Sequence, residues 1–294
     1  MQRIQKLIGV FSICLGFALV GRAQELPQPS PAAKVEQRIG LTDVSVVYSR
    51  PGVKGRTIWG ELEKWDVMWR AGANAATLVE FSDDVTVKGN KIPAGKYAFY
   101  LTPSQGDWTV TFNKGVENWG VDGYKAEEDV ASFKVAATEG PLVERLRYSF
   151  ENMTNAGGDL VMAWEKVRVA VPIEVDVEKK AWSNIEKALE EAEADKKWRV
   201  LRNGAMYCAE MNTRLDQGIE WINESLALHD SWYSLNVKAE LQHAQGDTQS
   251  ARKTMETAIE KGEQWAKDND QEFDGYRRML ESKMKQFTDG KISN

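Results

Sequence analysis

The sequence predicts a multi-domain protein, an antiparallel β-sandwich of eight or nine strands followed by an array of helical hairpins. Residues 35–177 alternate apolar and polar side chains with a period of two, which is typical of strands. Residues 178–290 are rich in Ala, Leu, Glu, Lys and Trp at three-and-four spacing, which is typical of amphipathic helices. Within this second part a residue pattern recurs after 33 or 34 positions, which indicates repeated hairpins.

β-branched and aromatic residues gather in short runs within the first domain. The runs cover residues 44–48, 77–81, 85–87, 97–101, 108–112, 133–135, 142–150, 160–164 and 167–175. Turn-forming residues separate them. Lys88-Gly-Asn90 and Pro93-Ala-Gly95 predict reversals, and residues 104–107 and 155–159 predict hairpin loops. Few helical stretches lie between the runs, so we expect an antiparallel sandwich or a flattened barrel.

The helical part repeats itself once. The recurring residues, each followed by its equivalent in the second copy, are Trp198 and Trp232, Leu201 and Leu235, Ala205 and Ala239, Gly218 and Ala251, Ile222 and Met255, and Ser225 and Ala258. A helix-turn-helix period of 34 residues with small residues at the helix crossing is the pattern of a tetratricopeptide repeat. The first copy is degenerate, because it lacks the turn glycine that the second has at Gly246. Residues 179–195 and 271–287 are expected to form flanking helices.

The N-terminus has the three-part layout of a secretory signal peptide over residues 1–23. A basic start is followed by the apolar run Leu7–Val20 and by small residues at Gly21 and Ala23. We therefore expect cleavage near Ala23 and export to the periplasm or the exterior. The alternative, an uncleaved membrane anchor, would need about 20 apolar residues, more than this run supplies. The three prolines of residues 24–34 then predict a flexible lead-in.

Charge and cysteine content narrow the classes of partner. Without residues 1–23 the count of Lys plus Arg falls from 38 to 35 against 44 Asp plus Glu, a net charge of about −9. Duplex DNA and anionic lipid surfaces need clustered cations, so neither is expected as a general partner. No segment after residue 23 is apolar enough to span a membrane, so no membrane span is expected. Cys208 is then the one cysteine of the mature chain, and its helical spacing among apolar residues predicts a buried, unreactive thiol.

The β domain lacks the residues of the common catalytic schemes. The two histidines, His229 and His243, lie in the helical part, so Ser-His and Cys-His nucleophiles and a histidine zinc site are not expected in the β domain. No phosphate-binding loop, dinucleotide fingerprint or calcium loop occurs, and no cofactor is expected. Paired carboxylates remain as a catalytic route, as in glycoside hydrolysis. The candidates are Glu61, Glu63, Asp66, Glu80, Asp122 and Glu165.

The densest group of polar and aromatic residues runs from residue 49 to residue 74. The candidate binding residues, with one tryptophan from further along the chain, are Arg50, Arg56, Trp69, Arg70, Asn74 and Trp119. In one interpretation the arginine forks and the amide form a pocket for an anionic or polyhydroxyl ligand, with the tryptophans as stacking faces. In the other, the arginines hold neighbouring acids or strand-end carbonyls and the tryptophans belong to the core. The sequence favours the second interpretation.

Several motifs of the first domain resemble a known bacterial family. They are Tyr48-Ser-Arg-Pro-x-Val-Lys-Gly-Arg56, Val67-x-Trp-Arg-x-Gly-Ala-Asn-Ala-Ala-Thr77 and Trp108-Thr-Val-x-Phe-Asn-Lys114. Over residues 30–177 the chain is similar to the family catalogued as domain of unknown function 2911. The resemblance implies an exported β-sandwich, often followed by tetratricopeptide-like helices, and no established activity. It supplies no catalytic residues.

Together these features favour a binding or scaffolding protein over an enzyme. We expect the helical hairpins to hold a peptide or protein partner and the β domain to carry a small polar pocket. Two alternatives stay open: a carboxylate-dependent enzyme acting on a glycan, and a module that binds carbohydrate without chemistry. The absence of a histidine base from the β domain is the reason for preferring a protein that does not catalyse a reaction.

Overall fold

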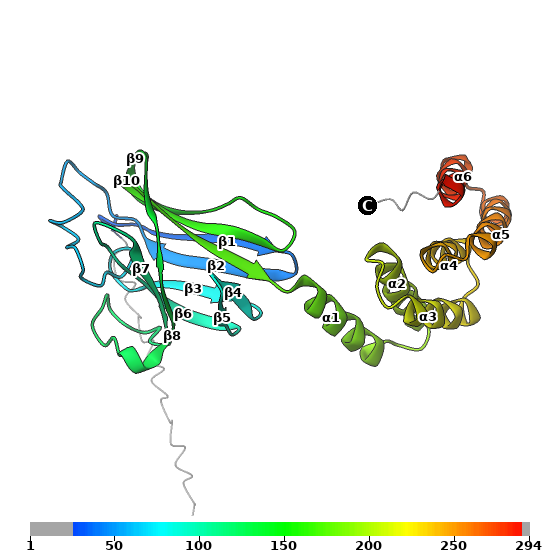
Figure 1. The fold of residues 1–294 in the computed structure, drawn as a ribbon, viewed down its shortest axis with the longest axis horizontal. Helices are drawn as coiled ribbons and strands as arrows, with labels where there is room; N and C mark the ends of the chain where they lie inside the picture. The colour runs from blue at the N-terminus through cyan, green and yellow to red at the C-terminus, as the bar shows by residue number, and fades with distance from the viewer. Residues whose placement is uncertain (1–25, 290–294) are drawn as a thin grey trace, which may run out of the picture. The chain divides into compact units, whose positions relative to one another are not determined.

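The computed structural model describes residues 26–289, which form two compact units that meet between Val175 and Asp176 (Figure 1). The first unit contains two antiparallel sheets and the second contains α-helices. The predicted order, a β domain followed by a helical array, is thereby confirmed. The expected signal peptide and its cleavage site near Ala23 lie outside the described residues.

The two sheets of the first unit contain ten strands within residues 26–289. The larger sheet has the order β1-β2-β3-β6-β7-β8 and the smaller one the order β5-β4-β10-β9. The larger sheet comprises β1 (Ala32–Ile39), β2 (Thr42–Ser49), β3 (Thr77–Phe81), β6 (Gly95–Thr102), β7 (Trp108–Asn113) and β8 (Asp129–Val135). The smaller sheet comprises β4 (Val85–Val87), β5 (Asn90–Ile92), β9 (Ala137–Glu151) and β10 (Gly157–Val175), and a short 3₁₀ helix, η1 (Ala126–Glu128), precedes β8.

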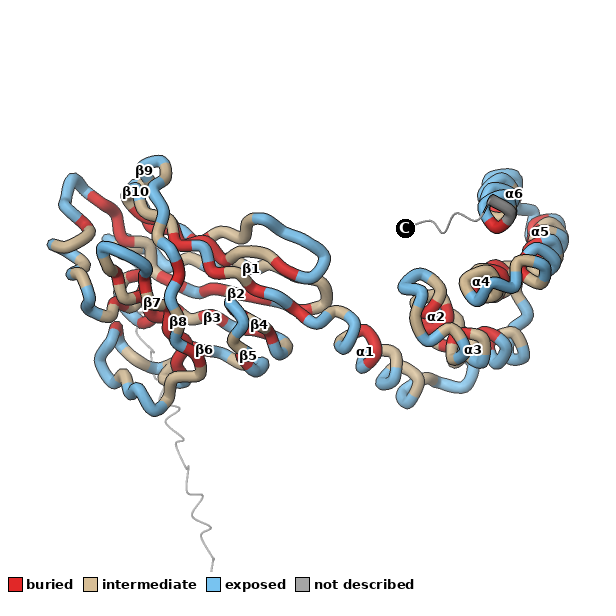
Figure 2. The backbone as a smooth tube through the Cα atoms, viewed as in Figure 1, coloured by how far each residue is buried: buried red, intermediate tan, exposed pale blue. Residues whose placement is uncertain are grey.

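Alternation along the strands buries one face of each sheet in a shared core (Figure 2). On β2, for example, Val44 and Val46 are buried while the intervening side chains point outward. Tyr48 on β2 and Phe99 on β6 contact Tyr148 on β9, with ring centroids 4.7 and 6.2 Å apart. Because these contacts join the two sheets face to face, the domain is a sandwich.

The described residues contain ten strands, against the predicted eight or nine. β5 was not predicted, β8 and β9 begin before the predicted runs, and β1 and β10 differ in other ways. β1 starts at Ala32, inside the span that the prolines predicted as a flexible lead-in, because its residues pair with β2 along the whole strand. The runs 160–164 and 167–175 are a single strand, β10. Glu165 takes a left-handed backbone there (φ 54°) and the register with β9 shifts on both sides of it, which forms a β-bulge within the continuous strand.

Six α-helices form the second unit of the described chain. They are α1 (Val177–Glu191), α2 (Lys197–Glu210), α3 (Leu215–Leu228), α4 (Trp232–Ala244), α5 (Thr248–Asp268) and α6 (Asp274–Asp289). α2 packs on α3 and α4 packs on α5, as two consecutive hairpins. α4 also contacts α2, α3 and α6. It is therefore enclosed by its neighbours, and none of its side chains is exposed.

The residues that recur between the two hairpins lie at helix contacts. Gly218, Ile222 and Ser225 on α3 are buried, and so are their equivalents on α5. An added Cβ at Gly218 would lie 2.7 Å from Leu241 of α4, so the first hairpin needs a smaller residue than the second at this position. The likeness to tetratricopeptide repeats stays a prediction. Cys208 is fully buried and burial raises the pKa of its thiol, which confirms the predicted buried cysteine.

The glycines of α5 and α6 give a test of this packing. Gly262 on α5 lies against the ring of Phe273, and an added Cβ would overlap that ring, whereas Gly275 on α6 has open space around it. Helix propensity alone favours Ala over Gly by up to about 1 kcal/mol at both positions. We expect Gly275→Ala to stabilise the protein slightly and Gly262→Ala to destabilise it by about 1–3 kcal/mol. Urea unfolding of both variants measures the difference, and equal stabilisation by both would contradict the packing at Phe273.

Candidate functional site

The candidate binding residues lie mainly in the long segment of residues 50–76, which joins the neighbouring strands β2 and β3 of the larger sheet. Backbone bridges tie this segment to the sheets at two points. Gly52 pairs with Arg145 of β9, and Trp69 pairs with Leu101 of β6 through N–H···O bonds of 2.7 and 3.0 Å. The segment is therefore a fixed part of the domain, although it contains no strand of its own.

The three candidate arginines donate to backbone carbonyls. Arg50 Nε donates to Leu146 O at 2.9 Å, and so holds the segment against β9. Arg56 donates to Val53 O at 3.0 Å and to Gly52 O at 2.5 Å, within its own turn. Arg70 Nη1 donates to Asn74 O at 2.7 Å. These bonds satisfy carbonyls that have no strand partner, which is the structural role that the sequence favoured.

Of the other three candidate residues, Asn74 and Trp69 are held by hydrogen bonds within the domain and Trp119 is exposed. Asn74, in a left-handed conformation (φ 64°), donates from its amide to Ser30 O and Ser49 Oγ at 3.3 and 3.2 Å. Trp69 is only 4% exposed and donates to Gly72 O at 3.0 Å, so it is a core residue. Trp119 is 63% exposed and is available to a ligand. It precedes Gly120, over which the guanidinium of Arg70 packs.

Glu63 lies where the charges of two of the arginines act on it. Its backbone carbonyl accepts from Gly60 N–H at 2.8 Å, and the residue is half-buried. Burial raises the pKa of its carboxyl to about 7, while the charges of Arg70 and then Arg56 act in the opposite direction. Carboxyls with a pKa near neutrality are typical of proton-transfer sites. Among the carboxylates that the sequence put forward, Glu63 is thus the strongest candidate for transferring a proton.

A separate hollow of about 490 Å³ opens on the β domain beside this segment. It is lined by Trp65, by the β6–β7 loop at Ser104, Gln105 and Gly106, by Trp108, and by residues 137–139 of β9 and 165–167 of β10. Two carboxylates, Glu139 and Glu165, share it with one ammonium group, Lys166. Sequence reasoning put forward Glu165 but missed Glu139 and Trp65, because residues from four distant segments meet only in the folded chain.

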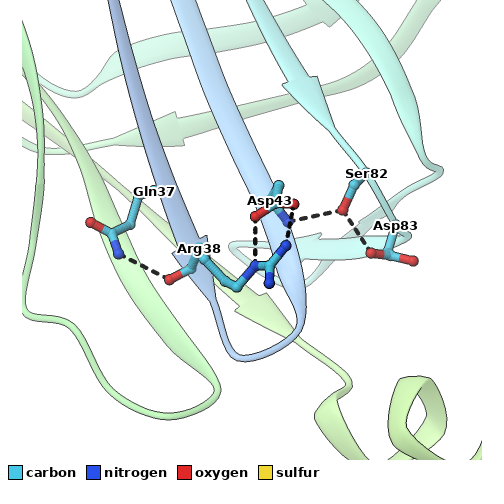
Figure 3. Close-up of polar contacts among 5 residues, drawn as sticks. All are labelled: Gln37, Arg38, Asp43, Ser82 and Asp83. Carbon is cyan, nitrogen blue, oxygen red and sulfur yellow. Dashed lines mark hydrogen bonds and ion pairs between the residues drawn. The ribbon is translucent and has the colours of Figure 1, made fainter. Parts of the chain in front are cut away.

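A second hollow, of about 550 Å³, lies on the outer face of β1, β2 and β3 and is made of paired charges. Figure 3 shows its best-defined part, where Arg38 and Asp43 face each other across the β1–β2 turn in two hydrogen bonds of 2.7 Å. Ser82 accepts from the backbone N–H of Asp43 and donates to Asp83. These groups satisfy one another, and charged side chains on an edge strand such as β1 disfavour its pairing with another sheet.

The helical unit carries a group of cations on aromatic faces, which we call the arginine–aromatic cluster: Trp198, Arg199 and Arg202 of α2 and Tyr233 of α4. Each guanidinium lies about 5 Å from a ring centroid, Arg199 over Trp198 and Arg202 over both rings. Sequence reasoning recorded Trp198 as a repeat residue and overlooked the arginines beside it. Their spacing at one helical turn was the signal that could have found them.

The two histidines are both packed on aromatic rings. His229 stacks on Trp198 with centroids 4.1 Å apart, at the end of α3 as the sequence placed it. His243 of α4 stacks on Phe287 of α6 at 4.5 Å. Within residues 26–289 no group of three or more His, Cys, Asp or Glu side chains is placed to hold a metal ion. In the same residues no helix is long and apolar enough to cross a membrane.

Comparison with known proteins gives one match. A protein-family model described as a protein of unknown function, DUF2911, matches residues 30–173, which is the sandwich without the helical unit. No curated protein matches the chain, and no solved structure does. The match agrees with the resemblance of the motifs between Tyr48 and Lys114 and assigns no activity.

The environment of Glu63 predicts how stability depends on pH. Its carboxyl titrates near 4.5 when unfolded and near 7 when folded, so folding favours the protonated form. The stability from this group is complete below about pH 4.5 and is lost as the pH rises through about 7. After allowance for partial solvent exposure the loss is about 1–2 kcal/mol. Glu63→Gln, which does not ionise, should remove it.

Urea unfolding of wild type and Glu63→Gln at about pH 5 and about pH 8 measures this effect. The variant should gain about 1–2 kcal/mol relative to wild type at the higher pH. Glu61→Gln, on the exposed side chain two residues away, is the matched control and should leave the wild-type pH dependence intact. An unchanged pH dependence in Glu63→Gln would show that this carboxyl is solvated.

Proposed function

Since the β domain of this chain belongs to the DUF2911 family of proteins of unknown function, we propose a function from the geometry: the protein is a binding protein whose helical unit holds an acidic segment of a partner polypeptide. The arginine–aromatic cluster is the observation that carries this proposal. It combines side chains that anchor protein interfaces, namely tryptophan, tyrosine and arginine, on two neighbouring helices.

The two arginines of the cluster lack an internal anion. Arg202 donates to the side-chain oxygen of its neighbour Asn203, at 3.1 and 3.4 Å. Neither Arg199 nor Arg202 forms an ion pair within residues 26–289. This contrasts with the nearby lysine Lys197, which pairs with Glu224 at 2.7 Å. The cluster therefore presents guanidinium groups whose charge is not neutralised by the protein itself.

Electrostatics favour an anionic occupant. Arg202 is half-buried, and burial is the main cause of a lowered pKa, to which the like charge of Arg199 also contributes. An anion bound between the two guanidinium groups would offset the burial of Arg202 and its repulsion by Arg199, because it replaces lost hydration and neutralises the like charges. Guanidinium forks match carboxylates in geometry, so Asp and Glu side chains or a C-terminal carboxylate are the expected groups.

The predicted repeat architecture supports contact along an extended peptide. Stacked hairpins expose a row of side chains along successive helices, and this row is the usual binding surface of helical repeats. Tyr233 of α4 extends the cluster from α2 toward the second hairpin, and its hydroxyl contacts the sulfur of Met206 at 3.6 Å. The proposed place of action is outside the cytoplasm, which rests on the signal-peptide pattern of residues 1–23. No catalytic step is assigned.

The proposal is tested with an array of random peptides that spans a range of net charge. We expect binding by the intact protein to increase with the negative charge of the peptide and to weaken at high salt. Arg199→Ala combined with Arg202→Ala should reduce the affinity of the best acidic peptides by about tenfold or more, because charge-assisted hydrogen bonds are lost.

Arg252→Ala, an exposed arginine on α5 outside the cluster, provides the control and should bind like wild type. Circular dichroism of the double variant checks that the helices are retained. Binding that is independent of peptide charge, or that survives in the double variant, would refute the proposal.

A further inference from the structure

We propose that the β domain binds a neutral oligosaccharide in the hollow formed by Trp65, the β6–β7 loop and the start of β9 against the bulge of β10. This site is independent of the proposed peptide surface, because it lies on the other unit of the chain. Its volume of about 490 Å³ is within the range of small-ligand pockets, which runs from about 300 to 1,000 Å³.

The aromatic part of the hollow is rigid. Trp108 lines the hollow but is only 1% exposed, and its indole N–H donates a hydrogen bond to Ser104 O at 3.0 Å. Behind it Trp59 packs on Trp108 with ring centroids 4.7 Å apart. Trp65 lies over Gly60 (φ 88°), where an added Cβ would be 2.5 Å from the indole nitrogen, so the glycine makes room for the ring. A fixed, half-buried indole offers the flat apolar face on which the C–H side of a sugar ring can stack.

The polar part of the hollow comes from the bulge. In the middle of the long strand β10, the backbone of Glu165 is held in the left-handed region. That region is unfavourable for residues other than glycine and, occasionally, asparagine or aspartate. The bulge turns this side chain to the hollow, and Lys166 N–H donates to its Oε2 at 2.6 Å, which fixes the carboxylate. Glu139 comes from the facing strand β9, opposite Val167 in the register. The two carboxylates thus approach the hollow from two strands.

The combination of groups selects the ligand class. Two carboxylates and one ammonium give the hollow a net negative charge, so an anionic ligand would be repelled. Carboxylates accept hydrogen bonds from hydroxyls, while Lys166 and the amide of Gln105 donate to them. Within residues 26–289 neither the Glu139 carboxylate nor the Lys166 ammonium is used in an ion pair. The matching ligand therefore carries hydroxyl groups, which both donate and accept, on a ring with apolar faces. A neutral sugar has these properties.

The test is a glycan array of neutral and acidic oligosaccharides, followed by titration of the intact protein with the best neutral glycan using tryptophan fluorescence. We expect binding of neutral members. Trp65→Ala and Glu165→Gln should each weaken binding by about tenfold, through loss of the stacking face and of a charged acceptor. Glu139→Gln, which changes an exposed residue of the hollow, should also weaken glycan binding and should leave the fold intact.

Two control variants match these changes. Glu174→Gln alters an exposed carboxylate on the same strand as Glu165, and Trp119→Ala removes an exposed tryptophan outside the hollow. Both should bind like wild type. The inference would be overturned if no neutral glycan bound, if only acidic glycans bound, or if Trp119→Ala abolished binding while Trp65→Ala and Glu139→Gln did not. Unchanged thermal unfolding of Glu139→Gln ensures that one hollow variant reports on binding alone.

Discussion

The β domain depends on the packing of four indole rings, three buried and one half-buried, where a long irregular segment meets both sheets. Trp59 and Trp69 come from residues 50–76, Trp108 from β7 and Trp164 from β10, and their centroids lie 4.7–5.7 Å apart. Each ring removes a large apolar area from water, so the cluster stabilises the segment more than its few bridges to the strands can. One member of the cluster, Trp108, also lines the hollow. A packing interaction therefore positions the surface on which a ligand can bind.

In this arrangement a long segment of backbone has no paired strand to satisfy its N–H and C=O groups. This explains why the candidate arginines donate to backbone carbonyls. Buried or half-buried carbonyls need donors. Arg56 and Arg70 donate to carbonyls of the segment itself, and Arg50 donates to Leu146 O of β9. Guanidinium groups that resemble a ligand pocket in the sequence are therefore used to hold the backbone. Glu63 is half-buried in the same segment, where the charges of Arg70 and Arg56 act on its carboxyl. The segment is best described as a packed cap on the sandwich, and its Trp65 contributes to the hollow that a ligand can enter.

The sequence predicted much of the fold and little of the candidate sites, for physical reasons. Period-two alternation and turn residues are local signals, and they located β2, β3, β6 and β7 to within a few residues. β1 was missed because it directly follows three prolines and because its pairing with β2, not its own composition, makes it a strand. The bulge at Glu165 depends on the register with β9 and has no local signature. Glu139 and Trp65 meet through contacts between segments far apart in the chain, which periodicity does not report.

The helical unit shows how a repeat becomes specific. With a period of 34, the positions of Arg199 and Arg202 in the first copy correspond to Tyr233 and Asn236 in the second. In the second copy these residues belong to α4, which is enclosed by its neighbours, and Asn236 is only 3% exposed. A charged residue there would lose its hydration, so the equivalent positions cannot both be arginine. Tyr233 instead packs against the Arg202 guanidinium. The cation-rich surface thus arises where α2 is less enclosed than α4, and burial, rather than the repeat itself, decides where a binding group can stand.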